Sequence, residues 1–128
     1  MDPSSEIEAV VEEFPHARAA VDVQAMKSLL SSSHHVRLIG SGESDWTQGY
    51  DQVVEGWSGQ GGEIRAVPDR TVRRLEAFES GDTGWAAVEQ EITFSDGQTS
   101  VVRITLVVVL EGSRWKIAQI HFSVPLAD

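Results

Sequence analysis

The sequence contains no cysteine, which excludes disulfide bonds and thiolate metal sites. It is also short of basic residues, with 10 lysines and arginines against 20 aspartates and glutamates and a formal net charge of −10. Such a charge repels phosphate backbones and anionic lipid surfaces. We therefore expect neither a nucleic-acid nor a membrane partner.

No apolar run approaches the roughly 20 residues that cross a bilayer. The N-terminal residues 1–6 are acidic where a signal peptide is basic, so we expect a cytoplasmic protein. Phosphate-binding loops and nucleophile motifs are absent. His34 and His35 are adjacent and point to opposite faces of a strand, and neither forms a recognised ligand spacing with Glu89. No metal and no cofactor are expected.

The first half of the chain has the pattern of helices. An amphipathic helix is predicted from Ile7, with Pro15 kinking or restarting it, and a second is predicted after the capping residue Asp22. A third helix is expected around Trp57, ending at Gly59. With 128 residues, the chain has room for one domain with its own core.

The second half has the pattern of strands. A short strand at residues 36–39 is followed by a glycine-rich loop in which Trp46 could act as a lid. Further strands are predicted over residues 63–67, 70–79, 85–94, 99–110 and 115–124. Helices followed by a meander predict an α+β fold. We expect three N-terminal helices packed on a strongly curved antiparallel sheet that forms a cone-shaped pocket.

The dipeptide Asp96-Gly97 is a signal for a two-residue hairpin. Counting outward from it places Glu89 opposite Ile104 and Glu91 opposite Val102, so both glutamates would face the apolar pocket. Burial there would raise the pKa of a carboxyl group and suit it to general acid–base catalysis.

Alternation within the same strand favours the opposite arrangement. In that arrangement both glutamates face solvent, while Val88, Ile92 and Phe94 point inward. Both arrangements stay open at this stage.

The other face of the sheet carries polar side chains among valines and suits a sheet-to-sheet contact with a second copy of the chain. A three-residue turn at residues 111–113 would place Arg103 opposite His121 and Leu106 opposite Ala118. We therefore expect a homodimer, and we interpret His121 as an interface residue. The predicted interface residues are Gln90, Arg103, Thr105, Gln119 and His121.

Three segments together resemble the nuclear transport factor 2-like superfamily, and in particular its SnoaL-like branch. They are Val21–Leu30 in the second helix, Gln48–Val54 at the start of the third, and Gly112–Ser123 at the end of the sheet. The resemblance covers nearly the whole chain and implies a single SnoaL-like domain over residues 1–128, usually dimeric.

The superfamily includes steroid isomerases, cyclases, dehydratases and binding proteins without chemistry, so the fold alone selects no function. The catalytic positions of the steroid isomerases fall on Leu38, Phe14 and Leu106, which are apolar, so that mechanism does not carry over. The resemblance also implies that four residues line the pocket: Trp57, Glu89, Glu91 and Phe122.

The sequence predicts a homodimer that binds a small apolar or polycyclic molecule. If the protein is an enzyme, Glu89 and Glu91 would carry proton-transfer chemistry, namely isomerisation, dehydration or cyclisation. The alternative is a non-catalytic binding or self-association module. The predicted substrate-binding residues are Leu38, Trp46, Trp57, Leu106 and Phe122.

Overall fold

The computed structural model describes residues 1–19, 22–33, 35–40, 42–59, 69–93 and 96–125. Within these ranges it contains three helices, α1 (Ser5–Ala19), α2 (Val23–Leu29) and α3 (Tyr50–Gly59). The strands are β1 (Asp2–Pro3), β2 (Arg37–Ile39), β3 (Trp46–Gln48), β4 (Asp69–Ser80), β5 (Thr83–Thr93), β6 (Thr99–Glu111) and β7 (Arg114–Ser123).

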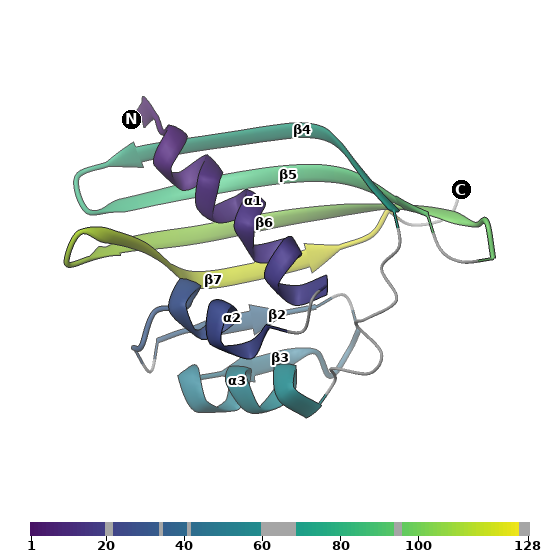
Figure 1. The fold of residues 1–128 in the computed structure, drawn as a ribbon, viewed down its shortest axis with the longest axis horizontal. Helices are drawn as coiled ribbons and strands as arrows, with labels where there is room; N and C mark the ends of the chain where they lie inside the picture. The colour runs from purple at the N-terminus through teal and green to yellow at the C-terminus, as the bar shows by residue number, and fades with distance from the viewer. Residues whose placement is uncertain (20–21, 34, 41, 60–68, 94–95, 126–128) are drawn as a thin grey trace.

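The strands form one curved, open sheet in the order β1-β4-β5-β6-β7-β2-β3. Its pairs are antiparallel except for β2 with β7, which run parallel. The helix α1 crosses one face of the long strands, and α2 and α3 lie beside the β2–β3 end (Figure 1). The predicted α+β class, with helices packed on a curved antiparallel-rich sheet, is confirmed.

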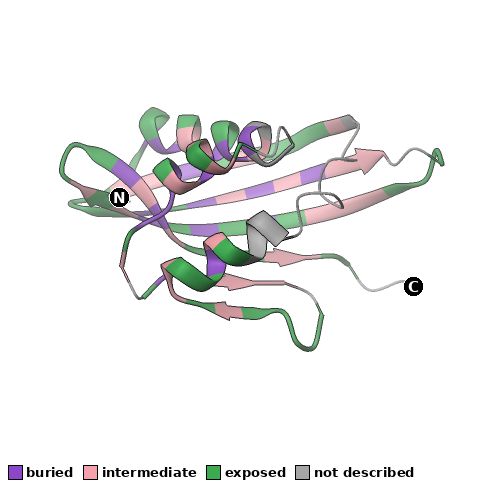
Figure 2. Ribbon diagram, turned by 60° about the horizontal axis from the view of Figure 1, so that its bottom comes forward, coloured by how far each residue is buried: buried purple, intermediate pink, exposed green. Residues whose placement is uncertain are grey.

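The helix α1 forms as the apolar spacing predicts. Ile7, Val11 and Phe14 are buried against the sheet, and the Ser4 hydroxyl accepts a hydrogen bond from the Ile7 N–H at 3.2 Å. The helix continues through Pro15 to Ala19 and does not restart there. Figure 2 shows the resulting pattern, with buried residues toward the sheet and exposed residues outward.

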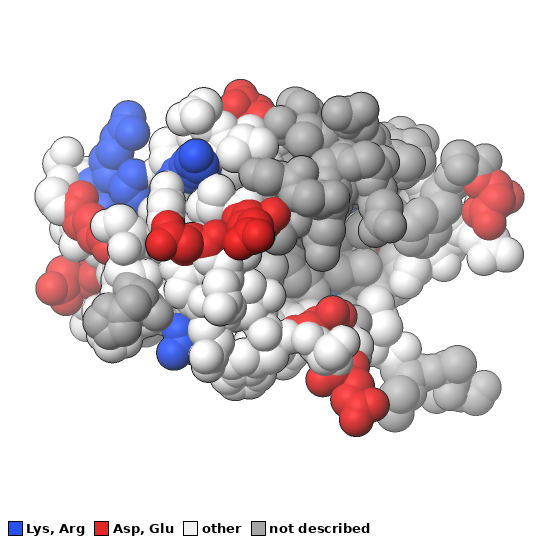
Figure 3. All heavy atoms as spheres, turned by 90° about the horizontal axis from the view of Figure 1, so that it is seen from below, with Lys and Arg blue, Asp and Glu red and all other residues white. Residues whose placement is uncertain are grey.

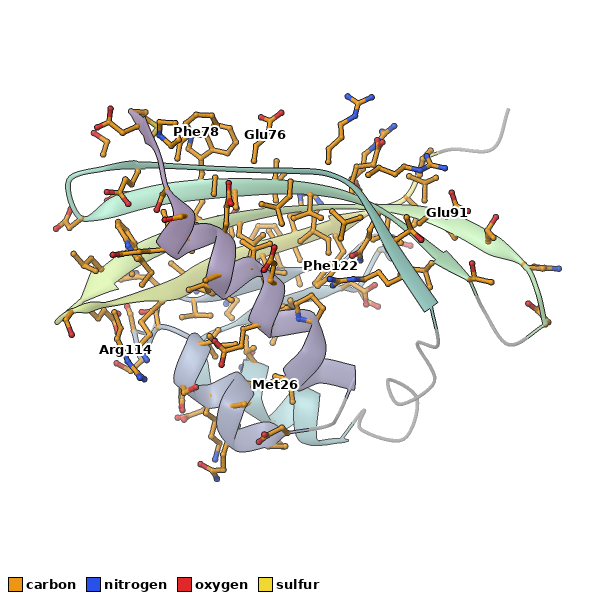
Figure 4. All side chains as sticks on the ribbon, turned by 45° about the horizontal axis from the view of Figure 1, so that its top comes forward. Met26, Glu76, Phe78, Glu91, Arg114 and Phe122 are labelled. Atoms are coloured by element: carbon orange, nitrogen blue, oxygen red, sulfur yellow. The ribbon has the colours of Figure 1, made fainter. Side chains whose placement is uncertain are left out.

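The second helix begins where its cap was predicted. The carboxylate of Asp22 accepts a hydrogen bond from the Ala25 N–H at 3.0 Å, which satisfies one donor of the first turn. Met26 and Leu29 of this helix join the core. Figure 4 shows Met26 below α1, among the helices.

The predicted register of the β5–β6 hairpin is wrong by one residue. Thr93 pairs with Thr99, so Glu89 lies opposite Arg103, and Val88 lies opposite Ile104. Gly97 has the positive φ of 85° that a turn requires, but the pairing of Thr93 with Thr99 does not fit a two-residue turn at Asp96-Gly97. The register follows burial of the alternating apolar residues.

The predicted register of the β6–β7 hairpin is also wrong. The turn holds two residues, with Gly112 at a φ of 65°, and Glu111 pairs with Arg114. An irregularity between Val107 and Val108 then shifts the pairing, so that Leu106 lies opposite Ile120. Arg103 consequently lies opposite Ser123.

A second irregularity lies in β4 between Val72 and Arg74, and such bulges bend and twist a sheet.

Two further predictions are corrected by the structure, and others fall on residues that it does not describe. Trp46, predicted in a loop, lies in the edge strand β3. Gln90, predicted on the interface face, is 5% exposed and lines the side of the sheet that α1 covers. The predicted strand at residues 63–67 and the side chain of Trp57 lie outside the described part of the structure, as does Phe94.

Candidate functional site

A pocket lies between the C-terminal half of α1 and the inner face of β4, β5 and β6. It is mostly open to solvent, because its empty volume of about 310 Å³ counts that open space, and the sheltered part has room for about one water molecule. Most of the wall is apolar. The described lining residues are Val11, Phe14, Pro15, Arg70, Val72, Leu75, Val88, Gln90, Ile104 and Leu106.

Gln90 is the first polar group of this wall. Its side-chain oxygen Oε1 is buried and has no hydrogen-bond partner among the described residues. A buried amide oxygen without a donor costs the folded state free energy, roughly 1–3 kcal/mol for groups of this kind. The pocket therefore presents an acceptor that a bound molecule or a water can satisfy.

Arg70 is the second polar group. It lies at the start of β4, opposite Ile92, and is partly buried. Burial lowers the pKa of its guanidinium, and the carboxylate of Glu12 on α1 raises that pKa by a smaller amount. Among the described residues no carboxylate forms a salt bridge with Arg70. An arginine keeps its proton at neutral pH, so the pocket wall carries a positive charge that no described carboxylate pairs with directly.

Glu89 and Glu91, the predicted catalytic residues, lie on the opposite face of the sheet from this pocket. Glu89 accepts from Arg103 at 3.3 Å and lies 3.7 Å from Arg74, while Glu91 pairs with Arg73. Figure 4 shows Glu91 near the end of the long strands farthest from the β4–β5 turn. Of the two arrangements that the sequence left open, the structure has the one in which both glutamates face outward, because Val88 and Gln90 occupy the inward positions of β5. The place in an apolar pocket that hairpin counting and the resemblance implied is wrong.

Four of the five predicted substrate-binding residues have described side chains, and these four are spread over the molecule. Leu106 lines the pocket. Phe122 lies opposite Ile104 and packs against the core, between α1 and the sheet in Figure 4, and Leu38 packs against the same core from β2. Trp46 is 59% exposed at the far edge of the sheet. Neither Leu38, Phe122 nor Trp46 belongs to the described pocket lining, and their role in binding stays a prediction.

Sequence reasoning did not single out Arg70 as a site residue and placed Gln90 on the wrong face. The signal for Gln90 was present, because it shares its parity in β5 with the buried Ala86 and Val88. The sequence indicates the inward position of Arg70 less clearly, because the bulge at Arg73 interrupts the alternation of inward and outward residues along β4.

The outer face of the sheet is left uncovered by the three helices (Figures 1 and 2). Arg103, Thr105 and His121 are exposed there, as predicted for a polar face. Trp85 and Phe78 add an aromatic pair, with ring centroids 5.0 Å apart. Figure 4 shows Glu76 and Phe78 pointing away from α1.

Two further classes of site were sought in the described residues. No group of three or more histidines, aspartates or glutamates that could hold a metal ion occurs among them. No helix in the same ranges is long and apolar enough to cross a membrane. On the side shown in Figure 3, acidic side chains outnumber basic ones, in keeping with the net charge of −10.

The family model of the SnoaL-like domain matches residues 7–127. The chain belongs to the SnoaL-like domain family. The match covers α1 from Ile7 onward, α2, α3 and the strands β2 to β7.

Solved structures agree with this assignment at the level of the fold. A nuclear transport factor 2-like protein of unknown function from Pseudomonas putida KT2440 has a TM-score of 0.80 and 17% identity, over 96% of this chain and 87% of that one. A proposed ketosteroid isomerase from Shewanella frigidimarina has a TM-score of 0.80 and 16% identity, over 94% and 96%. A proposed dehydratase from Streptomyces avermitilis has a TM-score of 0.77 and 17% identity, over 95% of each chain.

At these identities the likeness shows the fold and no shared activity. No curated protein sequence matches the chain. The function of this SnoaL-like domain must therefore be argued from its own pocket.

Proposed function

We propose that this SnoaL-like domain binds a small organic molecule with a mainly apolar body in the pocket beneath α1. The observation that carries the proposal is the buried, unpartnered Oε1 of Gln90 in an otherwise mostly apolar wall. Apolar pockets with a few polar groups are the usual form of small-molecule sites. The unpaired acceptor gives such a molecule a fixed orientation.

Binding is favoured over catalysis by the chemistry of the wall. Its described residues include no carboxylate and no histidine, the usual general acids and bases. Similar structures include a proposed isomerase and a proposed dehydratase, so proton-transfer chemistry is the second candidate. It would require Glu89 or Glu91 to reach a substrate from the outer face of the sheet.

The second part of the proposal concerns the assembly. We propose that the uncovered outer face packs against the same face of a second copy, giving a homodimer. Arginines and glutamates are interspersed on this face, with Arg103 and Arg74 beside Glu89. A two-fold axis brings such a mixed surface against itself with charges of opposite sign in reach.

The pocket is tested by closing it. Val72 lines the pocket and is 39% exposed, so Val72→Trp should fill the opening without disturbing the core. Thr71→Trp is the matched control, because Thr71 is exposed and adjacent in β4 but points to the outer face. Two-dimensional amide NMR with a set of small organic fragments at millimolar concentration reports binding.

We expect fragments to shift the amide signals of Val88, Gln90 and Ile104 in the wild type and in Thr71→Trp. In Val72→Trp these shifts should fall at least tenfold at equal fragment concentration. If no fragment perturbs these residues in the wild type, or if Val72→Trp responds as the wild type does, the pocket is not the binding site.

A further inference from the structure

The two polar groups of the pocket are neighbours on its wall. Arg70 pairs across the strands with Ile92, and Gln90 is two residues from Ile92 on the same face of β5. Residues in this diagonal relation have backbones about 7–8 Å apart. An arginine side chain spans most of that distance, so one molecule can contact both groups at once.

Gln90 and Arg70 form hydrogen bonds with opposite kinds of partner, one with a donor and the other with an acceptor. The amide oxygen of Gln90 accepts and needs a donor such as a hydroxyl or an ammonium. The guanidinium of Arg70 donates and carries charge, and its planar fork matches the two oxygens of a carboxylate. Neither group has such a partner among the described residues. The Gln90 oxygen therefore bears a cost of burial that no described residue offsets, whereas Arg70 is only partly buried and keeps contact with solvent.

We propose that the ligand of this pocket is a small monocarboxylate with a hydroxyl or amino group close to the carboxylate and an apolar remainder. The carboxylate pairs with Arg70, the neighbouring donor bonds Gln90 Oε1, and the apolar part lies against residues such as Leu75, Val88 and Leu106. This inference rests on the proposed function, because it names the chemical class that the proposed site binds.

The charge of the surroundings selects a single negative charge over a phosphate. Among the described lining residues Arg70 supplies the one guanidinium, and Glu12 on α1 lies close enough to influence it. A phosphate dianion would leave a charge unpaired beside Glu12, whereas a carboxylate is neutralised by one arginine. The protein as a whole carries a net charge of −10, which adds to the repulsion of a dianion.

Three probes that share a phenyl group separate these contributions. 3-Phenyllactate has the carboxylate and the hydroxyl, 3-phenylpropionate has only the carboxylate, and 3-phenylpropane-1,2-diol has the hydroxyl without the charge. Calorimetric titration of the full chain, with amide NMR to locate binding, compares their dissociation constants. We expect 3-phenyllactate to bind about tenfold more tightly than either of the others, as the loss of one well-placed hydrogen bond or ion pair predicts.

Variants assign the contacts. Arg70→Gln should weaken 3-phenyllactate at least tenfold and leave the diol within twofold, whereas Gln90→Leu should abolish the advantage of the hydroxyl. Arg74→Gln is the control, because it removes the same charge from the outer face of the same strand. Without ligand, Gln90→Leu should raise the melting temperature by a few degrees, since it removes an unsatisfied buried acceptor.

The outcomes separate this inference from the proposed function. If the diol binds as tightly as 3-phenyllactate, or if Arg70→Gln binds 3-phenyllactate like the wild type, the pocket binds small molecules but not carboxylates as a class. If all three probes and the neutral fragments leave the pocket amides unchanged, both proposals fail. A lower melting temperature in Gln90→Leu would show Gln90 to be structural and overturn its role toward the ligand.

Discussion

At the scale of single residues, Glu89 and Gln90 show that the face of the sheet on which a side chain lies determines the contacts it makes. They are consecutive in β5, so one side chain points outward and the other points toward α1. The Glu89 carboxylate is 20% exposed and has two arginine partners, Arg74 and Arg103. The Gln90 oxygen is buried and has no partner. The charged residue is thus satisfied by the fold, and the neutral one is the group left available for a ligand.

This difference predicts a mild phenotype for Glu89→Gln. The ion pairs of Glu89 involve arginines whose side chains are 76% and 57% exposed, and pairs of this kind contribute about 1 kcal/mol or less. We expect urea denaturation to show a loss of no more than about 1 kcal/mol, and ligand binding to stay unchanged. Glu76→Gln, an exposed glutamate on the same face, is the control. A selective loss of ligand binding or turnover in Glu89→Gln would restore its predicted catalytic role.

At the scale of elements, the sequence predicts where strands and helices occur better than how they pair. The long strands β4 to β7 lie within two residues of their predicted ends, because alternation and turn residues are local signals. Asp96-Gly97 did mark a turn, but its presence does not determine the length of the loop. If the loop is longer or shorter by an odd number of residues, the pairing of the two strands shifts by one residue, and the side chains predicted for one face lie on the other.

The same limit explains what could be predicted of the site. Leu106 lines the pocket, because apolar alternation places it inward in either register, and its role in substrate binding stays a prediction. Hairpin counting placed Glu89 on the inner face and Gln90 on the outer one, whereas alternation within β5, the arrangement that also stayed open, gives the outward Glu89 that is found. The parallel pairing of β2 with β7 joins residues about 80 positions apart, and no local pattern encodes it. Arg70 became a candidate only once β4, β5 and α1 were placed together.

Close packing of α1 on β5 gives a prediction at this scale. A Cβ atom added at Gly84 would lie 2.5 Å from Cδ1 of Ile7 and 2.6 Å from the backbone oxygen of Phe78. Alanine is ordinarily preferred to glycine in a strand, but here the clash should dominate. We expect Gly84→Ala to lower the free energy of unfolding by about 1–3 kcal/mol.

Urea denaturation measures this loss. The control is Ala87→Val, which adds bulk to the same strand on the outer face, where no helix packs. That variant should change stability by about 0.5 kcal/mol or less. A Gly84→Ala protein as stable as the wild type would show that α1 can move away from β5, and the tight contact with Ile7 would then not be required.

At the scale of the whole molecule, the three helices leave one face of the sheet bare. The strands β4 to β7 hold 10–13 residues each, so the bare face is broad. It exposes apolar side chains such as Trp85 and Val107 between charged ones. Broad faces of mixed apolar and charged character suit contact with another protein surface. A second copy of the chain supplies a surface that is complementary by symmetry.

Val107 and Leu110 allow a matched test of the proposed dimer, because both lie in β6 and both are 36% exposed. Val107 points to the bare face, whereas Leu110 has the parity of Val108 and lies opposite the buried Trp115. A lysine at Val107 would bury an unpaired charge in the interface. We expect light scattering after size exclusion to show dimers for the wild type and Leu110→Lys, and monomers for Val107→Lys. A dimer that survives Val107→Lys, or a monomeric wild type at micromolar concentration, would exclude the bare face as the interface.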